Sequence, residues 1–359
     1  MSRPLISRLD RYIVRQVLGF SALVALALVA IYSFVAFVGD LDETGRGGFG
    51  LAELALYTLL GVPEGLAVML PIIALLGTLL GLGALAGQGE LTAMRAAGVT
   101  HLRIGAAALL AGAGLGVLAW ALGDALVPYA QTRAEQLRSE ARYGQSAGAV
   151  QRPIWLRDGN ELFHIRRLVS ETEMAEITRY SLADDLSLRA AATVARGRYQ
   201  GEGRWQFEAV QRSRFEGDQV TVERLPEEDY RGGLSPEVLR LFVLRADALD
   251  IAGSLRLIAY LEENGLEATA SRVGLWQKLV APFTVMALTL FAVPFVFGPQ
   301  RGGHGQRLLI GVGVGLAFFV LNEVAASLAG LYRWPPALAI SAPTLLITAA
   351  GLWRLQRAW

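Results

Sequence analysis

Six runs of mostly apolar residues divide the chain, three before and three after a long polar middle. They lie at residues 17–39, 66–87, 104–123, 279–297, 308–331 and 335–353. A helix needs about 20 such residues to cross the hydrocarbon core of a bilayer, and each run is close to that length. Prolines interrupt the last run, but membrane helices tolerate proline because neighbouring groups satisfy the freed backbone. We therefore predict six transmembrane helices.

The first run follows a cluster of arginines, an arrangement that also begins secretory signal peptides. Its 23 residues are too long for the apolar region of such a peptide, and no small-residue cleavage pattern follows. We expect this run to be an uncleaved membrane anchor.

The polar middle has the alternation of β-strands. "PIWLRDGNELFHI" is two short apolar runs joined at Asp158 and Gly159, which is a strong hairpin signal. In the later segments "GRWQFEAV" and "DQVTVERL", the apolar residues that alternate with polar ones are Trp205, Phe207, Ala209, Val220 and Val222. Several short strands at this spacing predict an all-β domain, either a sandwich or a barrel, inserted between the third and fourth membrane helices.

Two helical segments border the predicted strands. Residues 129–143 are charged and favour a helix, so we expect them to extend the third span out of the membrane. After the strands, Ser254 can cap a short helix that ends at Asn264 and Gly265. Leu255, Ile258 and Leu261 would share one face of that helix.

The distribution of charge supports this division. Residues 124–267 hold 43 of the 65 charged side chains, although the whole chain is only 18% charged. We therefore expect membrane helices 1–3 in residues 1–123, a polar β domain in residues 124–267, and membrane helices 4–6 in residues 268–359. This composition excludes a soluble enzyme and a disordered protein, and the absence of cysteine excludes a disulfide scaffold.

Arginine placement predicts the orientation, since cytoplasmic loops of membrane proteins carry an excess of Arg and Lys. The segments that would share the cytoplasmic side with the N-terminus carry Arg95, Arg103, Arg301, Arg307, Arg354 and Arg357. The loop after the first span is acidic, with Asp40, Asp42, Glu43, Glu53 and Glu64 against Arg46. Both termini are therefore expected in the cytoplasm, with the large domain on the opposite side.

The sequence argues against catalysis by this chain. Lys278, the only lysine, lies in "GLWQKLVAP" and not in a phosphate-binding loop. The three histidines, His101, His164 and His304, lack the spacing of metal ligands, and a G-x-S-x-G nucleophile motif is missing. We expect no metal and no cofactor to be bound by this chain.

The connector at residues 88–98 is a candidate for contact with a cytoplasmic partner. Glu90 suits the positive end of a short helix, and Gly98 can end it. Leu91 and Met94, with Arg95 beside them, would give this helix a small apolar face for docking. A solvated connector without a partner is an equally good interpretation.

Basic residues on the outer side break the expected charge pattern and are candidates for lipid phosphates. They are Arg133, Arg138, Arg142, Arg272 and Lys278. The alternative is local ion pairing with Glu135 and Glu140. Within the fifth span, Asn322 and Glu323 are the intramembrane polar candidates, either for a gate or for a structural hydrogen bond between helices.

Small residues recur four apart in the spans, at Gly77 and Gly81, Gly83 and Gly87, Gly112 and Gly116, and Gly311 and Gly315. Such pairs allow helices to approach closely. Packing within the chain is favoured over subunit association for any single pair.

Six segments in register give the chain a resemblance to a known family. They read "YTLLGVP", "GELTAMRAAG", "ARYGQ", "WLRDGNELFHI", "FGPQR" and "YRWPPAL", and the resemblance covers residues 9–352. Together they resemble the LptF/LptG permease family of the bacterial lipopolysaccharide export transporter, and the LptG branch more than the LptF branch.

The resemblance implies a fold and a set of partners. The expected fold has six transmembrane helices and a periplasmic β-jelly-roll domain between the third and fourth. The expected partners are an LptB-like ATPase dimer, an LptF-like permease, and LptC, a single-span protein with its own jelly roll. ATP and Mg would be held by the ATPase, and the substrate is lipopolysaccharide in the outer leaflet of the bacterial inner membrane.

The resemblance also assigns roles to particular residues. Glu90 matches the coupling-helix glutamate that enters a groove on the ATPase, and Arg138 matches a basic residue that contacts the lipid headgroup near the cavity mouth. The first span matches a helix at the lateral gate, paired with the fifth span of LptF. Ala36, Asp42 and Glu43 stand where some members have lysine, so Arg46, Arg272 and Lys278 are candidates to replace those charges.

Two functions from other classes remain open. An ion-coupled secondary transporter would need several buried ionisable groups, and only Glu323 qualifies. A membrane-anchored β adaptor would tolerate unrelated helices, which the recurring small residues argue against.

Overall fold

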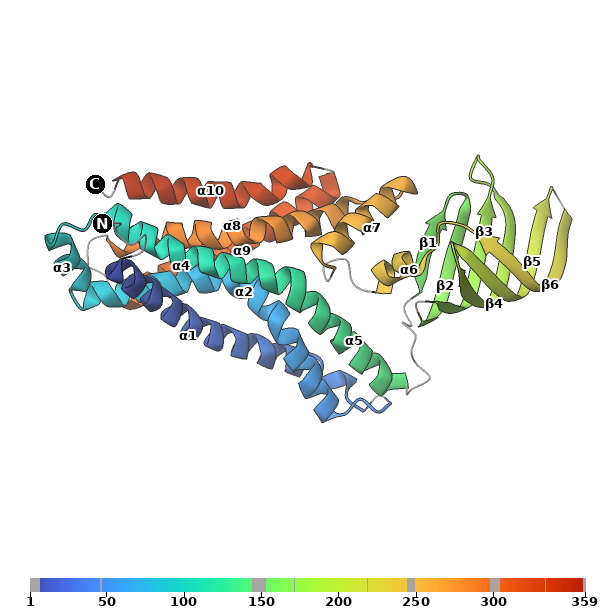
Figure 1. Ribbon diagram of the computed structural model, residues 1–359, viewed down its shortest axis with the longest axis horizontal. Helices are drawn as coiled ribbons and strands as arrows, with labels where there is room; N and C mark the ends of the chain where they lie inside the picture. Colours follow the sequence, from blue (N-terminus) through green and yellow to red (C-terminus); the bar gives the residue numbers. More distant parts are fainter. Residues whose placement is uncertain are drawn as a thin grey trace. The chain divides into compact units, whose positions relative to one another are not determined.

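The computed structural model describes residues 7–45, 47–143, 153–170, 172–217, 219–243, 249–297, 304–332 and 334–357. Within these ranges, six helical segments are long and apolar enough to cross a membrane, as predicted. They are built from α1 (Arg8–Gly39), α2 (Leu51–Gly87), α4 with α5 (His101–Ala121 and Val127–Tyr143), α8 (Thr269–Val296), α9 (His304–Tyr332) and α10 (Pro336–Arg357) (Figure 1).

Local side-chain bonds extend several of these helices beyond the apolar runs. At the start of α1, Ser7 and Asp10 form a reciprocal capping box, which satisfies backbone amides that a helix start leaves unpaired. At the start of α2, the Glu53 carboxylate accepts the Gly50 amide at 2.9 Å. α1 therefore begins nine residues before the first apolar run, and α2 begins fifteen residues before the second.

The third span continues as a helix into the polar region, which confirms the expectation for residues 129–143. α4 passes into a π-helical turn, η2 (Leu122–Leu126), and then directly into α5. Pro128 follows this turn and has no amide hydrogen to donate, so the regular bond pattern is interrupted there.

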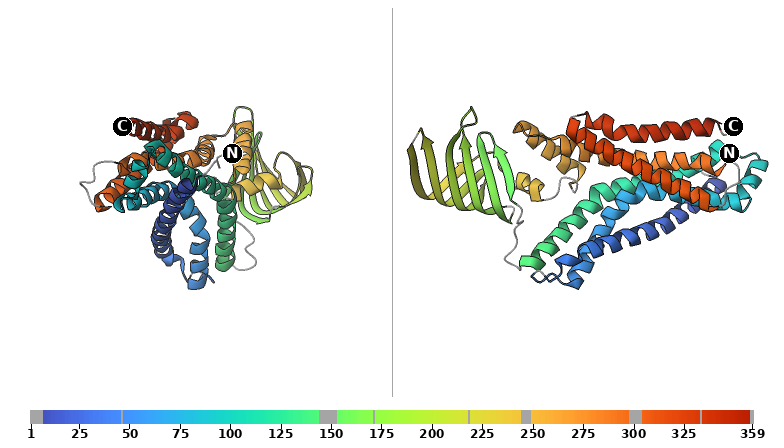
Figure 2. Two further views of the ribbon diagram at one scale, coloured as in Figure 1. Left: turned by 60° about the vertical axis from the view of Figure 1, so that its left-hand side comes forward. Right: turned by 180° about the vertical axis from the view of Figure 1, so that it is seen from behind.

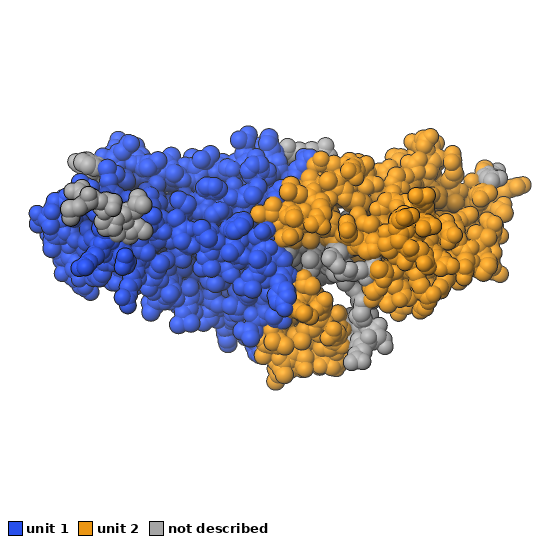
Figure 3. Space-filling view, viewed as in Figure 1, with its two compact units in different colours: residues 1–41, 58–130, 269–359 blue, residues 42–57, 131–268 orange. Residues whose placement is uncertain are grey.

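The chain divides into two compact units, coloured separately in Figure 3. The membrane unit comprises residues 1–41, 58–130 and 269–359. The β unit comprises residues 42–57 and 131–268, so it includes the loop after α1 as well as the polar middle.

The membrane unit is packed around α8, which lies against both α4 and α10. The core of this unit includes Leu82, Ile104, Ala108, Leu288 and Ala292, all fully buried. The short helix α3 (Glu90–Ala96), the start of α1 and the end of α10 lie at the same end of the unit (Figures 1 and 2).

Glycines allow close helix crossings inside the membrane unit, in agreement with the internal packing that the sequence favoured. A Cβ at Gly81 would lie 3.0 Å from the Val17 Cα, where α2 crosses α1. A Cβ at Gly116 would lie 2.9 Å from the Pro282 carbonyl oxygen, where α4 crosses α8. A Cβ at Gly311 would overlap the side chain of Leu79, where α9 meets α2.

The β unit contains one six-stranded antiparallel sheet in which each strand pairs with the next. Its strands are β1 (Ile154–Asp158), β2 (Glu161–Ser170), β3 (Glu173–Leu182), β4 (Leu188–Gly201), β5 (Arg204–Glu216) and β6 (Gln219–Arg231). The predicted hairpin joins β1 to β2, with Asp158 opposite Glu161 and Gly159 at a φ of 60°. The expected all-β domain is confirmed, and its described strands form a single sheet rather than the two sheets of a sandwich.

The strand alternation in β5 differs from the prediction at one position. Trp205 and Phe207 are fully buried as expected, but Ala209 is exposed and Val210 is buried instead. Ala209 has a φ of 52° and is skipped in the pairing between β5 and β6. The pairs Glu208–Glu227 and Val210–Leu225 keep the same register on both sides of Ala209, so no residue is inserted, and the side-chain alternation changes at this left-handed residue.

Two further predictions about this unit need correction. Val220 and Val222 do lie in β6, but both are more than half exposed, since β6 is the last strand of the sheet. The helix α7 (Ile251–Glu263) begins before Ser254, because the Asp250 side chain accepts the Gly253 amide and caps it. Consequently Leu257, Ile258 and Tyr260 face inward, and Leu255 is exposed. The helix ends at Asn264 and Gly265 as predicted.

Polar contacts join α7 to the first hairpin. The Tyr260 hydroxyl donates to the Arg157 carbonyl at 2.7 Å, and the Gly159 amide donates to the Asn264 side chain at 3.3 Å. Asp158 accepts the Tyr230 hydroxyl and the Gly233 amide, each at 2.7 Å. The "WLRDGN" segment is thus a structural junction between β1, β6 and α7.

Candidate functional site

The connector at residues 88–98 forms the short helix α3 between two glycines. Gly89 precedes it at a φ of 77°, and Gly98 follows it at a φ of 89°, a left-handed conformation that suits glycine. The chain therefore changes direction sharply before and after this helix. Glu90 is its first residue and accepts a hydrogen bond of 2.8 Å from the Tyr12 hydroxyl on α1.

The apolar side chains of α3 face the chain's own core. Leu91 is only 3% exposed, and Met94 packs against the same cluster. Thr92, Ala93, Arg95 and Ala96 form the exposed side of the helix. Leu91 and Met94 thus anchor the connector, and the surface open to a partner is made by Arg95, its small neighbours and the partly exposed Glu90.

Arg138 on α5 is held by three groups of the β unit. Its guanidinium forms an ion pair with Glu43 of η1 (Leu41–Glu43). It also donates to the Tyr57 hydroxyl at 3.2 Å and lies 5.4 Å from the centre of the Tyr57 ring. Phe49 packs edge-on against the same ring. The Arg138 side chain is only 21% exposed. Its ion pair with Glu43 agrees with local ion pairing, the alternative to lipid binding, although the partner is not one of the two expected glutamates.

The partners of Arg138 were not all foreseen. The sequence places Glu43 in the acidic loop after the first span and at a position where some family members have lysine, and Tyr57 only in the "YTLLGVP" segment. Glu43 lies 95 positions from Arg138 in the chain, so sequence spacing gives no signal that they meet. Glu135 and Glu140, the expected partners, are exposed on α5.

The other basic candidates differ from Arg138 in their exposure and surroundings. Arg133 is exposed and bonds Gln136 at 3.4 Å within α5. Arg272 is exposed and Lys278 half-buried, both on α8 of the membrane unit. Arg46 and the side chain of Arg142 lie outside the described residues. A role for any of these in lipid binding stays a prediction.

Two membrane helices present apolar surface that the described residues of the chain do not cover. On α9, a shallow groove of about 500 Å³ is lined by Gly313, Leu316, Ala317, Val320, Leu321 and Val324. Beside it, Asn322 is half-buried and Glu323 is exposed. Glu323 is thus on the surface of the chain and not inside its core.

The other uncovered surface belongs to α1. Its buried residues are Ile13, Val17, Ser21 and Val24, all within the first 17 of its 32 residues. In the second half, Leu26, Ile31, Phe34 and Val35 are each more than 60% exposed. Apolar surface of this size in a membrane helix is open to lipid or to another subunit.

Charged residues inside the β unit serve packing. Arg179 is almost fully buried and pairs with Glu228 at 2.9 Å across the sheet. Its guanidinium also lies 5.7 Å from the Tyr230 ring and 5.9 Å from the Phe207 ring. Glu228 additionally pairs with Arg212. A buried cation needs such compensation, so removal of Glu228 would leave an uncompensated charge inside the sheet.

Comparison with known proteins gives one consistent result. The family model described as "Lipopolysaccharide export system permease LptF/LptG" matches residues 11–357. The chain is 30% identical to the lipopolysaccharide export system permease protein LptG of Escherichia coli strain K12 over 352 residues, covering 97% of this chain and 98% of that protein. It is 28% identical to the protein of the same name from Haemophilus influenzae over 355 residues, covering 98% and 99% of the two chains.

Proposed function

Because this chain belongs to the LptF/LptG family of lipopolysaccharide export permeases, we propose that it is the LptG-type subunit of an ATP-driven exporter that lifts lipopolysaccharide out of the inner membrane. The family supplies the non-catalytic membrane subunits of this export system. In the proposal, a second, LptF-like permease faces this chain, an LptB-like ATPase dimer drives both, and LptC joins them with its single span.

The observation that carries the proposal is the uncovered apolar surface of α1 and α9. The outer half of α1 and the groove on α9 are exposed in this chain, whereas α2, α4 and α8 bury their apolar residues against one another. A second permease would cover these two faces and leave a space for acyl chains between the subunits. α1 and α9, with Asn322 and Glu323, would then line the cavity and its gates.

In this proposal, α3 is the part of the chain that contacts the ATPase and receives its movement. Its exposed side, with Glu90 and Arg95, would sit in a groove on the ATPase, while Leu91 and Met94 hold the helix to the membrane core. Movement of the ATPase would be passed to the bundle, because Leu91 is buried in the same cluster as residues of α1, α2 and α4.

Capture of the headgroup would involve Arg138. Lipid phosphates attract a guanidinium most strongly where water is largely excluded, and the Arg138 side chain is only 21% exposed. Arg133, Arg142, Arg272, Lys278 and Arg46 would add weaker contacts. The sheet would pass the lipid onward to the periplasmic bridge.

The proposed orientation has both termini in the cytoplasm and the β unit in the periplasm. The shared end of α1, α3 and α10 in the membrane unit supports this, together with the arginines of the cytoplasmic segments. The chain would bind no cofactor of its own, and ATP and Mg would stay on the ATPase.

Purification of the tagged chain from native membranes, with mass spectrometry of proteins and lipids, tests the proposal. We expect a stoichiometric ATPase, a second six-span permease and bound lipopolysaccharide. Recovery of the chain without an ATPase would refute the proposal and favour an ion-coupled transporter or a β adaptor.

A further inference from the structure

Two polar contacts join the first turns of α1 to the start of α3 and to the start of α4, the helix that follows the connector. At the start of α3, the Tyr12 hydroxyl donates to the Glu90 carboxylate at 2.8 Å. Tyr12 is 41% exposed, so its hydroxyl is not needed to fill a core. The contact fixes the direction of the Glu90 carboxylate at the first residue of the connector helix.

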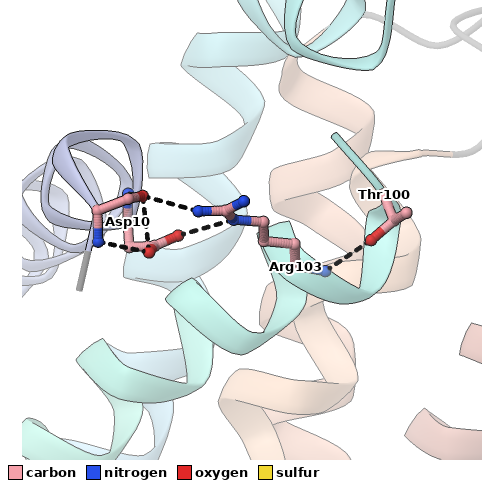
Figure 4. A network of polar contacts seen from close by, with 4 residues as sticks. Asp10, Thr100 and Arg103 are labelled. Atoms are coloured by element: carbon pink, nitrogen blue, oxygen red, sulfur yellow. Dashed lines mark hydrogen bonds and ion pairs between the residues drawn. The ribbon is translucent and has the colours of Figure 1, made fainter. Parts of the chain in front are cut away.

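After the connector, Arg103 on α4 reaches back to α1. Its guanidinium donates to the Ser7 hydroxyl at 3.0 Å and pairs with Asp10 at 3.5 Å (Figure 4). The backbone of Arg103 is itself fixed, because its amide donates to the capping side chain of Thr100. The start of α1 and the start of α4 are therefore held together by side chains.

The two oxygens of Asp10 have different partners. Oδ2 accepts the Ser7 amide at 2.9 Å and the Ser7 hydroxyl at 2.8 Å, which completes the cap of α1. Oδ1 faces Arg103. The Asp10 carboxylate thus caps α1 and also connects that helix to α4 through Arg103. A movement of α4 at this point would therefore displace the first turn of α1.

The packing of α1 against the other helices differs between its two parts. Ile13 and Val17, within the next turns, are fully buried, and Val17 is the point where Gly81 allows α2 to approach. Beyond Val24 the helix has no buried residue. The first part of α1, next to the connector, is therefore packed against other helices, and its second part is exposed. A movement of the packed part would displace the exposed part.

We propose that Tyr12, Asp10 and Arg103 are positioning residues that transmit movement of the coupling helix to α1, with Tyr12 acting through Glu90 and Arg103 acting through the cap of α1. This inference rests on the proposed function, because it takes Glu90 as the residue that receives force from the ATPase. It adds a route within one subunit from the ATPase contact to the helix with the exposed outer half.

The alternative is that these contacts only stabilise the fold. Arg103 is 52% exposed in its side chain, and exposed ion pairs contribute little to the free energy of folding. Tyr12→Phe removes one hydroxyl, and Arg103→Gln removes the charge while leaving the helix cap at Thr100 intact. Neither change is expected to prevent assembly, so both can be compared in a complete transporter.

The test uses the complete transporter in liposomes that contain lipopolysaccharide, with ATP hydrolysis and lipopolysaccharide release measured together. For Tyr12→Phe and Arg103→Gln we expect lipid released per ATP hydrolysed to fall about threefold or more, the factor that corresponds to one net hydrogen bond, with ATP hydrolysis kept. Arg103→Lys retains the charge and should restore part of the ratio. Arg11→Gln, which changes an exposed arginine on the same turns of α1, is the matched control and should leave the ratio unchanged.

An unchanged ratio in both Tyr12→Phe and Arg103→Gln would overturn the inference. An equal fall in Arg11→Gln would also overturn it, because a general loss of positive charge would then be the cause. If Glu90→Lys keeps normal coupling in the same assay, the proposed docking of α3 is wrong. The failure of the proposed function is thereby distinguished from the failure of this inference.

Discussion

Glu43 and Arg138 form an ion pair between the loop after α1 and α5, although they are 95 positions apart in the chain. The guanidinium is held on another side by the ring and hydroxyl of Tyr57. A phosphate that binds Arg138 must therefore compete with a carboxylate that is already in place. Strong headgroup capture would need Glu43 to move or a substrate with more than one negative charge.

This competition predicts opposite effects for two matched variants. Arg138→Gln should reduce crosslinking of lipopolysaccharide to the cavity mouth by about tenfold, the value of one charge-assisted hydrogen bond. Glu43→Gln removes the same ion pair but leaves the guanidinium free for phosphate, so its crosslinking should equal or exceed that of the wild type. Photocrosslinking in membranes measures both.

Equal losses in the two variants would show that the ion pair acts only by holding η1 to α5. A third variant, Arg133→Gln, reports on an exposed arginine of the same helix and should have a much smaller effect than Arg138→Gln.

Charge reversal at the connector should separate ATP hydrolysis from export. In Glu90→Lys, the carboxylate that accepts the Tyr12 hydroxyl is lost, and an ammonium would face the ATPase in its place. Export should fall at least about tenfold, because an unpaired charge at a buried interface costs several kcal/mol. Export at the wild-type rate would refute the docking of α3.

Helix packing gives a test that is independent of function. Gly116→Ala places a Cβ 2.9 Å from the Pro282 carbonyl, so overpacking should destabilise the α4–α8 contact by about 1–3 kcal/mol. Gly114→Ala, two residues earlier on α4, meets open space and is the control. Thermal unfolding in detergent should show a lower Tm for Gly116→Ala alone. Equal Tm values would contradict this crossing.

The β unit should lose stability at high pH through Tyr230. Burial and the hydrogen bond to Asp158 raise the pKa of the Tyr230 hydroxyl above its ordinary value of about 10. The folded state therefore favours the neutral hydroxyl. This contribution is full below pH 10 and is lost as the pH rises above 10 towards the folded pKa.

Tyr230→Phe should remove this dependence. The difference in Tm between wild type and variant, measured on the full chain from pH 8 to pH 11, should be largest at pH 8 and shrink above pH 10. Parallel curves over the whole range would contradict the role of Tyr230.

Much of the fold could be predicted from local patterns. Six apolar runs, the Asp158–Gly159 turn and the stop at Asn264 are each determined by neighbouring residues, and all three are present in the structure. Two of the predictions that were wrong also concern short stretches of the chain. The changed side-chain alternation at Ala209 coincides with one positive φ, and the start of α7 depends on whether Asp250 or Ser254 caps it.

The candidate site was harder to predict, because it depends on contacts between distant segments. Glu90 was recognised from its place in the connector, but its partner Tyr12 is 78 positions away. Leu91 and Met94 form an apolar face, and the sequence alone cannot tell whether that face meets a partner or the core of the same chain. The structure places it on the core.

Release of lipopolysaccharide from reconstituted liposomes tests the central claim most directly. This chain, the second permease, LptC and the ATPase are combined, and each is omitted in turn. We expect release that requires ATP hydrolysis, this chain and the ATPase together, and that stops with a hydrolysis-deficient ATPase. Release without nucleotide, or undiminished release without this chain, would contradict its role as a subunit of an ATP-driven exporter.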